Sequence, residues 1–129
     1  MKIKTIDHAA LNVSDLEASR KFYSEQLGFE EMDRPDFDFG GVWYAVGPNK
    51  EQFHLIVHKD MLKEDLPDAP KPRPEHHLAF RVDDVDAVRK EIEGRGVEIM
   101  MQNERSDGVT QMFVQDPDGY VIEFNNFPG

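Results

Sequence analysis

Near the end of the chain, a tight turn leads into a strand whose apolar and polar residues alternate. Residues 116–119, Asp-Pro-Asp-Gly, suit a tight turn because proline presets φ, glycine accepts a positive φ and aspartate bonds nearby backbone. In the strand that follows, the large apolar side chains fall on one face and Glu123 falls on the opposite one. A carboxylate at this position is costly to bury unless a positive group meets it, so this face is either open to solvent or built for a partner.

The first half of the chain predicts a strand, a helix and three further strands. Residues 14–17, Ser-Asp-Leu-Glu, form a capping box, which indicates a helix that begins at Ser14 and ends at Gly28. The loop after the second strand carries Phe37 and Phe39, which either line a pocket or pack beneath the loop. The segments predicted as strands are residues 2–13, 29–32, 42–46 and 52–57, with a turn at 47–50.

The same order of elements recurs in the second half. Four of the eight prolines fall within residues 59–74, which are also rich in charge, so this stretch is predicted to be a linker. Asp83 is predicted to cap a second helix, which Gly94 and Gly96 end. The predicted strands of this half are residues 75–82, 97–101, 109–115 and 116–124.

A constant offset in residue number, the one that carries Val13 onto Val82, aligns the two halves without a gap. Val13 and Val82 both stand just before a predicted helix, and the same offset carries Pro48 onto Pro117, just before the last strand. Agreement at both ends of the unit indicates an internal repeat. The pattern predicts an α+β fold, a single domain over residues 1–129 that consists of two tandem βαβββ modules, at about 2–58 and 75–127.

The repeat also pairs polar residues on the face away from the large apolar side chains. The same offset carries His8 onto His77 and His54 onto Glu123. Three imidazoles and one carboxylate suit a divalent transition metal, and two histidines with one carboxylate suit Fe(II). Other polar residues share this face by alternation and either orient a substrate or face solvent: Gln52, His58, Arg81, Gln111 and Asn125.

Composition narrows the classes of partner. The chain has 129 residues, a net charge of −11 and no cysteine. Without cysteine there is no disulfide framework and no thiolate metal site, and an acidic chain lacks the basic surface that nucleic acid or an anionic membrane requires. No apolar run approaches the length of a membrane span, and the N-terminus is not that of a signal peptide. We expect a cytoplasmic protein, while the charge says nothing about small substrates.

Three stretches resemble the vicinal oxygen chelate superfamily, which includes glyoxalase I, extradiol dioxygenases, fosfomycin-resistance thiol transferases, methylmalonyl-CoA epimerase and bleomycin-resistance proteins. They are the segment around His8, the segment around His77, and the Asp-Pro-Asp-Gly turn that leads to Glu123. The resemblance implies that the two modules form a cup-shaped mixed sheet with helices on its outer face, often completed in a homodimer. It also implies metal ligands at His8, His54, His77 and Glu123, for a divalent ion such as Zn, Ni, Fe, Mn or Co.

Two positions depart from the family patterns. Glyoxalase I generally has Glu where this chain has His54, and dioxygenases and fosfomycin enzymes manage with His-His-Glu, so the fourth position need not bind. The dioxygenase signature favours Tyr where this chain has Phe113; the residue at the repeat-equivalent position in the first half is Tyr44, which we expect to supply a phenol instead. With Arg81 and Gln111, these two aromatic residues are the predicted substrate contacts.

Three functions follow from the resemblance. The first is a metal-dependent lyase or isomerase of the glyoxalase type, in which the metal binds two adjacent substrate oxygens and Glu123, or a metal-bound hydroxide, moves a proton. The second is Fe(II)-dependent cleavage of a catechol ring through His8, His77 and Glu123. The third is a binding protein of the bleomycin-resistance type, which sequesters a hydrophobic ligand without chemistry. Neither a nucleotide fingerprint nor a glutathione site is evident in the sequence.

Overall fold

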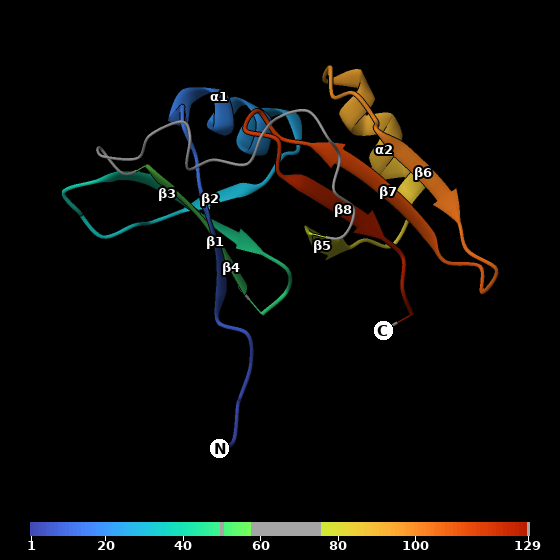
Figure 1. The fold of residues 1–129 in the computed structure, drawn as a ribbon, viewed down its shortest axis with the longest axis horizontal. Helices are drawn as coiled ribbons and strands as arrows, with labels where there is room; N and C mark the ends of the chain where they lie inside the picture. The colour runs from blue at the N-terminus through green and yellow to red at the C-terminus, as the bar shows by residue number, and fades with distance from the viewer. Residues whose placement is uncertain (50, 58–75, 129) are drawn as a thin grey trace. The chain divides into compact units, whose positions relative to one another are not determined.

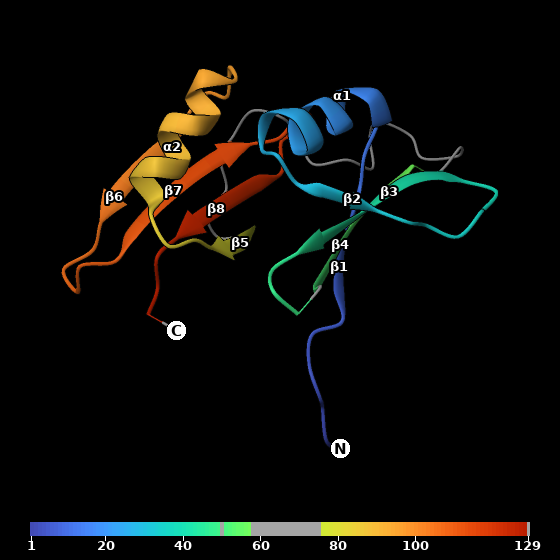
Figure 2. The same ribbon diagram turned by 180° about the vertical axis from the view of Figure 1, so that it is seen from behind.

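The computed structural model describes residues 1–49, 51–57 and 76–128. The chain folds into two compact units, the first of which carries strands β1–β4 and the second β5–β8. Figures 1 and 2 show the elements of each unit from opposite sides. The predicted linker at 59–74 lies outside the described residues, as does His58, so the limits of the two modules stay predictions.

The first unit contains four strands and one helical segment. Strand β1 (His8–Asn12) is followed by α1 (Leu16–Arg20), which continues directly into the wider π-helical turns of η1 (Lys21–Gln26). Three strands follow: β2 (Glu30–Met32), β3 (Gly40–Val46) and β4 (Glu51–Val57). They form one sheet in the order β1-β4-β3-β2, in which β1 runs parallel to β4 and the other neighbours are antiparallel.

The second unit repeats this arrangement. Its elements are β5 (His77–Arg81), α2 (Val85–Gly94), β6 (Met101–Glu104), β7 (Thr110–Gln115) and β8 (Val121–Asn125). The sheet order is β5-β8-β7-β6, again with the first strand parallel to the last. Each unit is therefore a βαβββ module, which confirms the predicted α+β fold.

The strand register shows the repeat at the level of single residues. His8 lies beside Gln52 in the first unit, and His77 lies beside Val121 in the second. The offset of the repeat carries His8 onto His77 and Gln52 onto Val121. After each first strand the backbone is held in the same way. Val13 N–H donates to Ile56 O at 2.9 Å, and Val82 N–H donates to Asn125 O at 2.8 Å.

Both helices begin one residue later than predicted. The N-caps are Asp15 and Asp84, not Ser14 and Asp83, and each aspartate accepts a hydrogen bond from the backbone N–H three residues on. The physical reason is that the chain is still extended at both positions, with φ of −136° and −139°, the conformation that lets an N-cap side chain reach back. The two caps still occupy equivalent positions of the repeat.

The first strand and the segment after α2 differ clearly from their predicted ranges. The first strand begins at His8, and residues 1–7 have no regular structure. Residues 97–100 are not a strand: Val97 N–H bonds Ile92 O and so completes the end of α2, and β6 begins only at Met101. The side chain of Val97 is buried, which explains why this segment has the apolar residue that suggested a strand.

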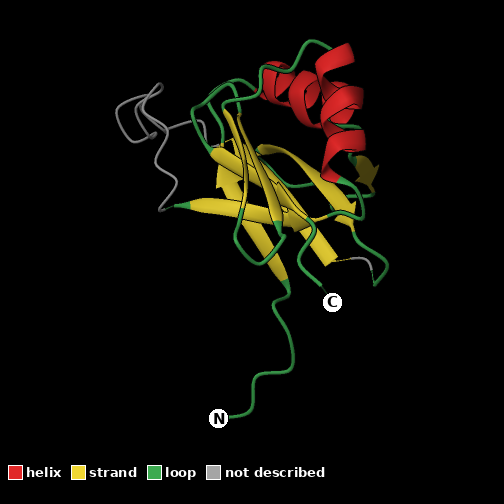
Figure 3. Ribbon diagram, turned by 90° about the vertical axis from the view of Figure 1, so that its right-hand side faces the viewer, coloured by secondary structure: helices red, strands yellow, loops and turns green. Residues whose placement is uncertain are grey.

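In each unit the helix packs against the unit's own sheet, α1 against β3 and α2 against β7, and Figure 3 distinguishes helices from strands by colour. The fully buried side chains of the core include Tyr23, Tyr44, Phe53 and Leu55 in the first unit and Ile92, Met112, Val114 and Ile122 in the second. Because strand side chains alternate, His54 points away from the core that holds Phe53 and Leu55. Glu123 likewise points away from the core of the second unit, which holds Ile122 and Phe124.

Candidate functional site

The first unit brings His8 and His54 together. Ala10 on β1 lies beside His54 on β4, and the His8 ring stacks on the His54 ring with centroids 4.4 Å apart and an interplanar angle of 16°. His8 Nδ1 lies 2.7 Å from Asp7 Oδ2, and His54 Nε2 lies 2.8 Å from Gln52 Oε1. The contact with Asp7 leaves Nε2 of His8 as the nitrogen through which it could bind a metal.

Trp43 covers the other side of His54. The two residues are cross-strand partners on β3 and β4, and their rings are nearly parallel, with centroids 4.2 Å apart. His54 is buried, and this burial lowers its pKa below the ordinary value, with the positive charges of His8 and Arg34 acting in the same direction and Asp7 opposing them. The imidazole is thus favoured in its neutral form, the form that binds metals.

The loop before β3 extends this aromatic stack. Phe37 and Phe39 stack on each other at 5.0 Å, the guanidinium of Arg34 lies over both rings, and Phe37 approaches Trp43 at 6.1 Å. Phe37 remains 41% exposed, so the loop is not simply core packing. These rings lie beside Trp43, which itself covers His54, and their place in a pocket stays a prediction.

The second unit brings His77 and Glu123 together. Ala79 on β5 lies beside Glu123 on the parallel strand β8, and His77 Nε2 lies 2.7 Å from Glu123 Oε2. Glu123 is only 2% exposed. The sequence predicted that a positive group would have to meet this carboxylate if it is buried; the structure places the imidazole of His77 there, which is positive only when it is protonated.

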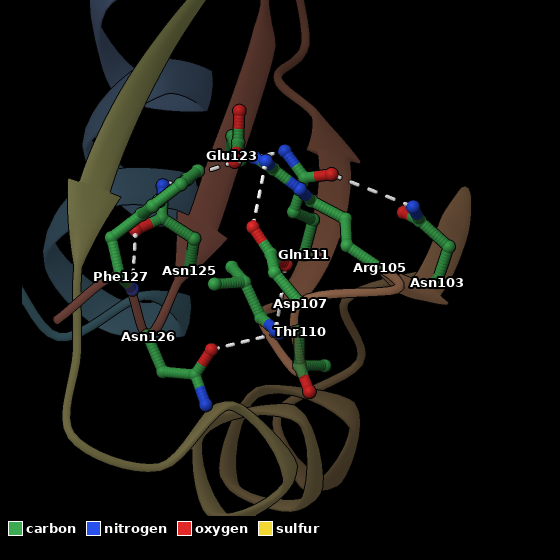
Figure 4. A network of polar contacts seen from close by, with 10 residues as sticks. Asn103, Arg105, Asp107, Thr110, Gln111, Glu123, Asn125, Asn126 and Phe127 are labelled. Carbon is green, nitrogen blue, oxygen red and sulfur yellow. Dashed lines mark hydrogen bonds and ion pairs between the residues drawn. The ribbon is translucent and has the colours of Figure 1, made fainter.

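Two side-chain amides reach the other oxygen of Glu123. Gln111 Nε2 donates to Oε1 at 2.9 Å and Asn125 Nδ2 donates to the same atom at 3.0 Å, as Figure 4 shows. The alternation of strand residues in the sequence predicted that both amides lie on this face. The structure shows that both contact the candidate ligand Glu123. They account for the buried charge together with His77.

Phe113 and Arg81 lie on the same face of the second sheet. Phe113 is the cross-strand partner of Glu123, and its ring meets the His77 ring edge to face with centroids 5.6 Å apart. Arg81 is exposed and pairs with Asn125 at the end of β5. Phe113 therefore forms an apolar wall beside His77 and Glu123, and its contact with substrate stays a prediction.

Tyr44 lies elsewhere. Its side chain is fully buried in the core, its hydroxyl is 2.8 Å from Ser24 Oγ, and burial raises the pKa of the phenol. It faces away from His54, because the alternating neighbour that pairs with His54 is Trp43. Tyr44 thus does not join His8 and His54, contrary to the expectation that it contacts substrate.

The reason for this difference is the length of one turn. In the first unit, four turn residues separate the paired Val46 and Glu51. In the second unit, only three separate Asp116 from Tyr120, whose carbonyl oxygen accepts a hydrogen bond from Asp116 N–H. The structural counterpart of Phe113 is therefore Trp43, one position before Tyr44. The sequence signal that could have found Trp43 was its alternation with the core residues Val42 and Tyr44.

Each unit thus contributes a pair of candidate ligands, two imidazoles in one and an imidazole with a carboxylate in the other. Within residues 1–49, 51–57 and 76–128, no group of three or more His, Asp or Glu side chains is gathered as a metal site. The donors nevertheless fit a divalent transition metal, since imidazole nitrogen and carboxylate oxygen are the usual ligands of Zn, Ni and Fe(II). In the part of the chain that the structure describes, no helix is long and apolar enough to cross a membrane.

The chain uses a βαβββ module twice and places a pair of candidate ligands on matching strands of each unit. Comparison with known families identifies the class of proteins to which this fold belongs. Residues 5–124 match the model of the Glyoxalase/Bleomycin resistance protein/Dioxygenase superfamily. The chain belongs to this superfamily.

Individual relatives agree with this assignment. The chain is 26% identical to Glyoxylase I 4 of Arabidopsis thaliana, over 98% of this chain and 72% of that protein. It is 31% identical to a lactoylglutathione lyase of Neisseria meningitidis, over 91% of this chain and 86% of that protein. Among solved structures, a glyoxalase family protein from Bacillus anthracis has a TM-score of 0.76 at 27% identity, covering 98% of this chain and 97% of the other.

Proposed function

We propose that this protein is a divalent-metal-dependent enzyme of the glyoxalase type, a lyase or isomerase that acts on a small substrate with two adjacent oxygens. The observation that carries the proposal is the contact between His77 and Glu123, a buried carboxylate held 2.7 Å from an imidazole in a member of this superfamily. Relatives that include a lactoylglutathione lyase support the reaction class.

The proposed ligands are His8, His77 and Glu123, with His54 as a fourth. The pair in each unit would supply half of the set, either from one chain or from two chains of a homodimer. His54 is the weakest candidate to bind through Nε2, because Gln52, which is not a proposed ligand, contacts that nitrogen at 2.8 Å, whereas His77 Nε2 contacts another proposed ligand, Glu123. His8 has no such conflict, since Asp7 contacts Nδ1 and leaves Nε2 for the metal.

A bound divalent ion would act as a Lewis acid that stabilises negative charge on a substrate oxygen. The chain's own residues have distinct roles in the proposal. Glu123 would serve the metal and the substrate proton in turn through the one oxygen Oε2, because Oε1 already accepts two amide hydrogen bonds. Phe113 excludes water on one side of His77, and Arg81, at the exposed end of β5, attracts an anionic substrate.

A second candidate is a binding protein of the bleomycin-resistance type. The observation that favours it is the run of flat side chains in the first unit, in which Trp43 stacks on His54 and Phe37 stacks on Phe39. Such rings bind planar ligands without any chemistry. The catechol dioxygenase has less support, because Phe113 lacks a hydroxyl and the phenol of Tyr44 is buried against Ser24.

The test is metal analysis of the full chain purified without chelator, followed by titration with Zn, Ni, Fe(II), Mn and Co. The reconstituted protein is then assayed for formation of lactoylglutathione and for oxygen uptake with catechols. Stoichiometric metal with lyase activity supports the proposal. Oxygen uptake would favour the dioxygenase, and a chain that binds none of these metals but binds planar hydrophobic compounds would be the sequestering protein.

A further inference from the structure

A chain of directed hydrogen bonds crosses the second sheet and ends on one oxygen of Glu123 (Figure 4). Asn103 Nδ2 donates to Gln111 Oε1 at 3.4 Å, and Gln111 Nε2 donates in turn to Glu123 Oε1. From the other side, Phe127 N–H donates to Asn125 Oδ1 at 3.3 Å, and Asn125 Nδ2 donates to Glu123 Oε1. Two independent amides therefore converge on the same atom.

The orientation of both amides follows from what each partner can donate or accept. A backbone N–H such as that of Phe127 can only donate, so Asn125 must present its oxygen there and its NH₂ group to Glu123. Oε1 of the ionised Glu123 can only accept, so Gln111 must present its NH₂ group there, which leaves its oxygen for Asn103, an amide that can present either group. Neither amide can turn its oxygen toward Glu123 without setting two acceptors against each other.

The two oxygens of Glu123 are consequently not equivalent. Oε1 accepts two hydrogen bonds from neutral amides, at 2.9 and 3.0 Å, whereas Oε2 contacts His77 Nε2 at 2.7 Å. A carboxylate oxygen that already accepts two such bonds has little capacity left for a cation. The carboxylate is also only 2% exposed, so water does not compete freely for either oxygen.

We propose that Gln111 and Asn125 are positioning residues that make Glu123 a one-oxygen group, which binds metal through Oε2 alone. The inference rests on the proposed function and deepens it, since it assigns the coordination mode of the only carboxylate in the ligand set. The bidentate mode, which a free carboxylate can adopt, is blocked by the two amides. A carboxylate that offers one oxygen instead of two would leave room at a bound ion for a substrate oxygen.

The test uses cobalt(II), whose visible absorption reports coordination number, added to the full chain. Gln111→Met, Asn125→Leu and the double variant remove the donors with little change in side-chain size. Gln115→Met is the matched control, because Gln115 lies on the same strand but donates to Gly119 O and not to Glu123. Circular dichroism establishes that each variant is folded before cobalt is added.

We expect the double variant to show a weaker visible band than wild type, because Oε1 becomes available and the coordination number rises. We also expect its cobalt affinity to change by about 10- to 100-fold, the range typical of lost outer partners of a metal ligand. The Gln115→Met control should match wild type in both measurements. A double variant that is less stable but has the wild-type cobalt spectrum would overturn the inference and show that the amides only solvate a buried charge.

A metal-free measurement separates this inference from the proposed function. In wild type, the side-chain NH₂ protons of Gln111 and Asn125 should exchange slowly in NMR spectra, and Glu123→Ala should accelerate both and leave Gln115 unchanged. If wild type binds no cobalt, the proposed function fails, yet slow exchange that depends on Glu123 still upholds the restraint on its oxygen. Fast exchange in wild type would overturn the restraint, whether or not metal binds.

Discussion

The rings of Trp43 and His54 lie nearly parallel, with centroids 4.2 Å apart and planes inclined by 4°. The same pairing of neighbouring strands places Phe113 opposite Glu123 in the second unit. Each unit thus sets an aromatic side chain against its candidate ligand at the fourth strand. The chemistry of the two candidate ligands differs, since one is an imidazole within a stack and the other is a buried carboxylate.

The first prediction concerns the ligands. Glu123→Ala should weaken binding of a divalent metal by about 100-fold or more, because it removes the only carboxylate from the set. His54→Ala should have a smaller effect, because Gln52 already contacts Nε2. Calorimetric titration of both variants measures the difference. Equal losses would make His54 a full ligand, and no loss in either variant would contradict the metal site itself.

The second prediction separates Tyr44 from the ligand face. Tyr44→Phe removes the hydroxyl that contacts Ser24 at 2.8 Å, so we expect the free energy of unfolding to fall by about 0.5–1.5 kcal/mol. Metal affinity and turnover should not change, since the side chain lies in the core of the first unit. Urea denaturation and metal titration measure the two effects. If a stable Tyr44→Phe variant lost turnover, the Tyr44 hydroxyl would take part in the reaction, contrary to this prediction.

The third prediction uses two glycines as a matched pair. A Cβ at Gly41 would lie 2.5 Å from Leu55 O and 3.1 Å from the guanidinium of Arg34, so Gly41→Ala should destabilise the protein by about 1–3 kcal/mol. A Cβ at Gly94 meets nothing within 4 Å, and Gly94 ends α2. Gly94→Ala should therefore stabilise by up to about 1 kcal/mol through helix propensity. Thermal and urea unfolding measure both variants; a neutral Gly41→Ala would show that β3 can shift at this point.

The fourth prediction concerns pH. Arg20 binds both oxygens of Glu31, at 2.8 and 2.6 Å, and this hydrogen bonding holds the pKa of Glu31 below its ordinary value, with Ser24 adding a further bond. A lowered carboxyl pKa gives stability that is complete above the unfolded pKa of about 4.3 and is lost as pH falls through the folded pKa.

Glu31→Gln should cost about 0.5–1 kcal/mol at pH 7, after allowance for solvent screening of a partly exposed pair, and much less near pH 3. The control is Glu93→Gln, which breaks the exposed pair with Arg89 and should change stability by less than about 0.5 kcal/mol at either pH. Urea unfolding at the two pH values gives both results. A Glu31→Gln effect that does not depend on pH would mean that the pair acts through packing alone.

The fifth prediction tests the observed helix caps. Asp84 Oδ1 accepts from Ala87 N–H at 3.0 Å, so Asp84→Ala should destabilise by about 1 kcal/mol. Asp83→Ala, one residue earlier, should change the free energy of unfolding by less than about 0.5 kcal/mol. Urea unfolding measures both variants. If Asp83→Ala destabilises the protein more than Asp84→Ala does, Asp83 is the N-cap, as the sequence suggested.

Much of the fold could be predicted because the repeat carries information that single segments lack. The faces of His8, His54, His77 and Glu123 followed from alternation, and alternation is fixed by the geometry of a strand. The caps were misplaced by one residue because Ser14 and Asp15 are both good N-caps, and only the backbone angles decide between them. The segment 97–100 was misread because a buried valine serves the end of a helix as well as a strand.

The site was less predictable than the fold. Gln111 and Asn125 could be assigned to a face, but their convergence on one oxygen depends on χ angles that a sequence pattern does not contain. The meeting of all four ligands stays a prediction, since the described contacts pair His8 with His54 and His77 with Glu123.

The third strand of each unit preserves a trace of how the two halves diverged. Met32 pairs with Trp43 in the first unit, and Met101 pairs with Phe113 in the second. The offset of the repeat carries Met32 onto Met101, but it carries Trp43 onto the residue before Phe113. The second strand of a unit therefore keeps the offset, whereas the third is displaced from it by one position. The last strand returns to the original offset, because His54 and Glu123 lie opposite Trp43 and Phe113. One added residue before β7 and one lost after it would account for this difference.

A shift of one position exchanges the two faces of a strand, so Tyr44 and Phe113 align in the ungapped sequence but lie on opposite faces. Any comparison of the two halves must therefore place a gap on each side of β7 before it assigns a role to a residue there.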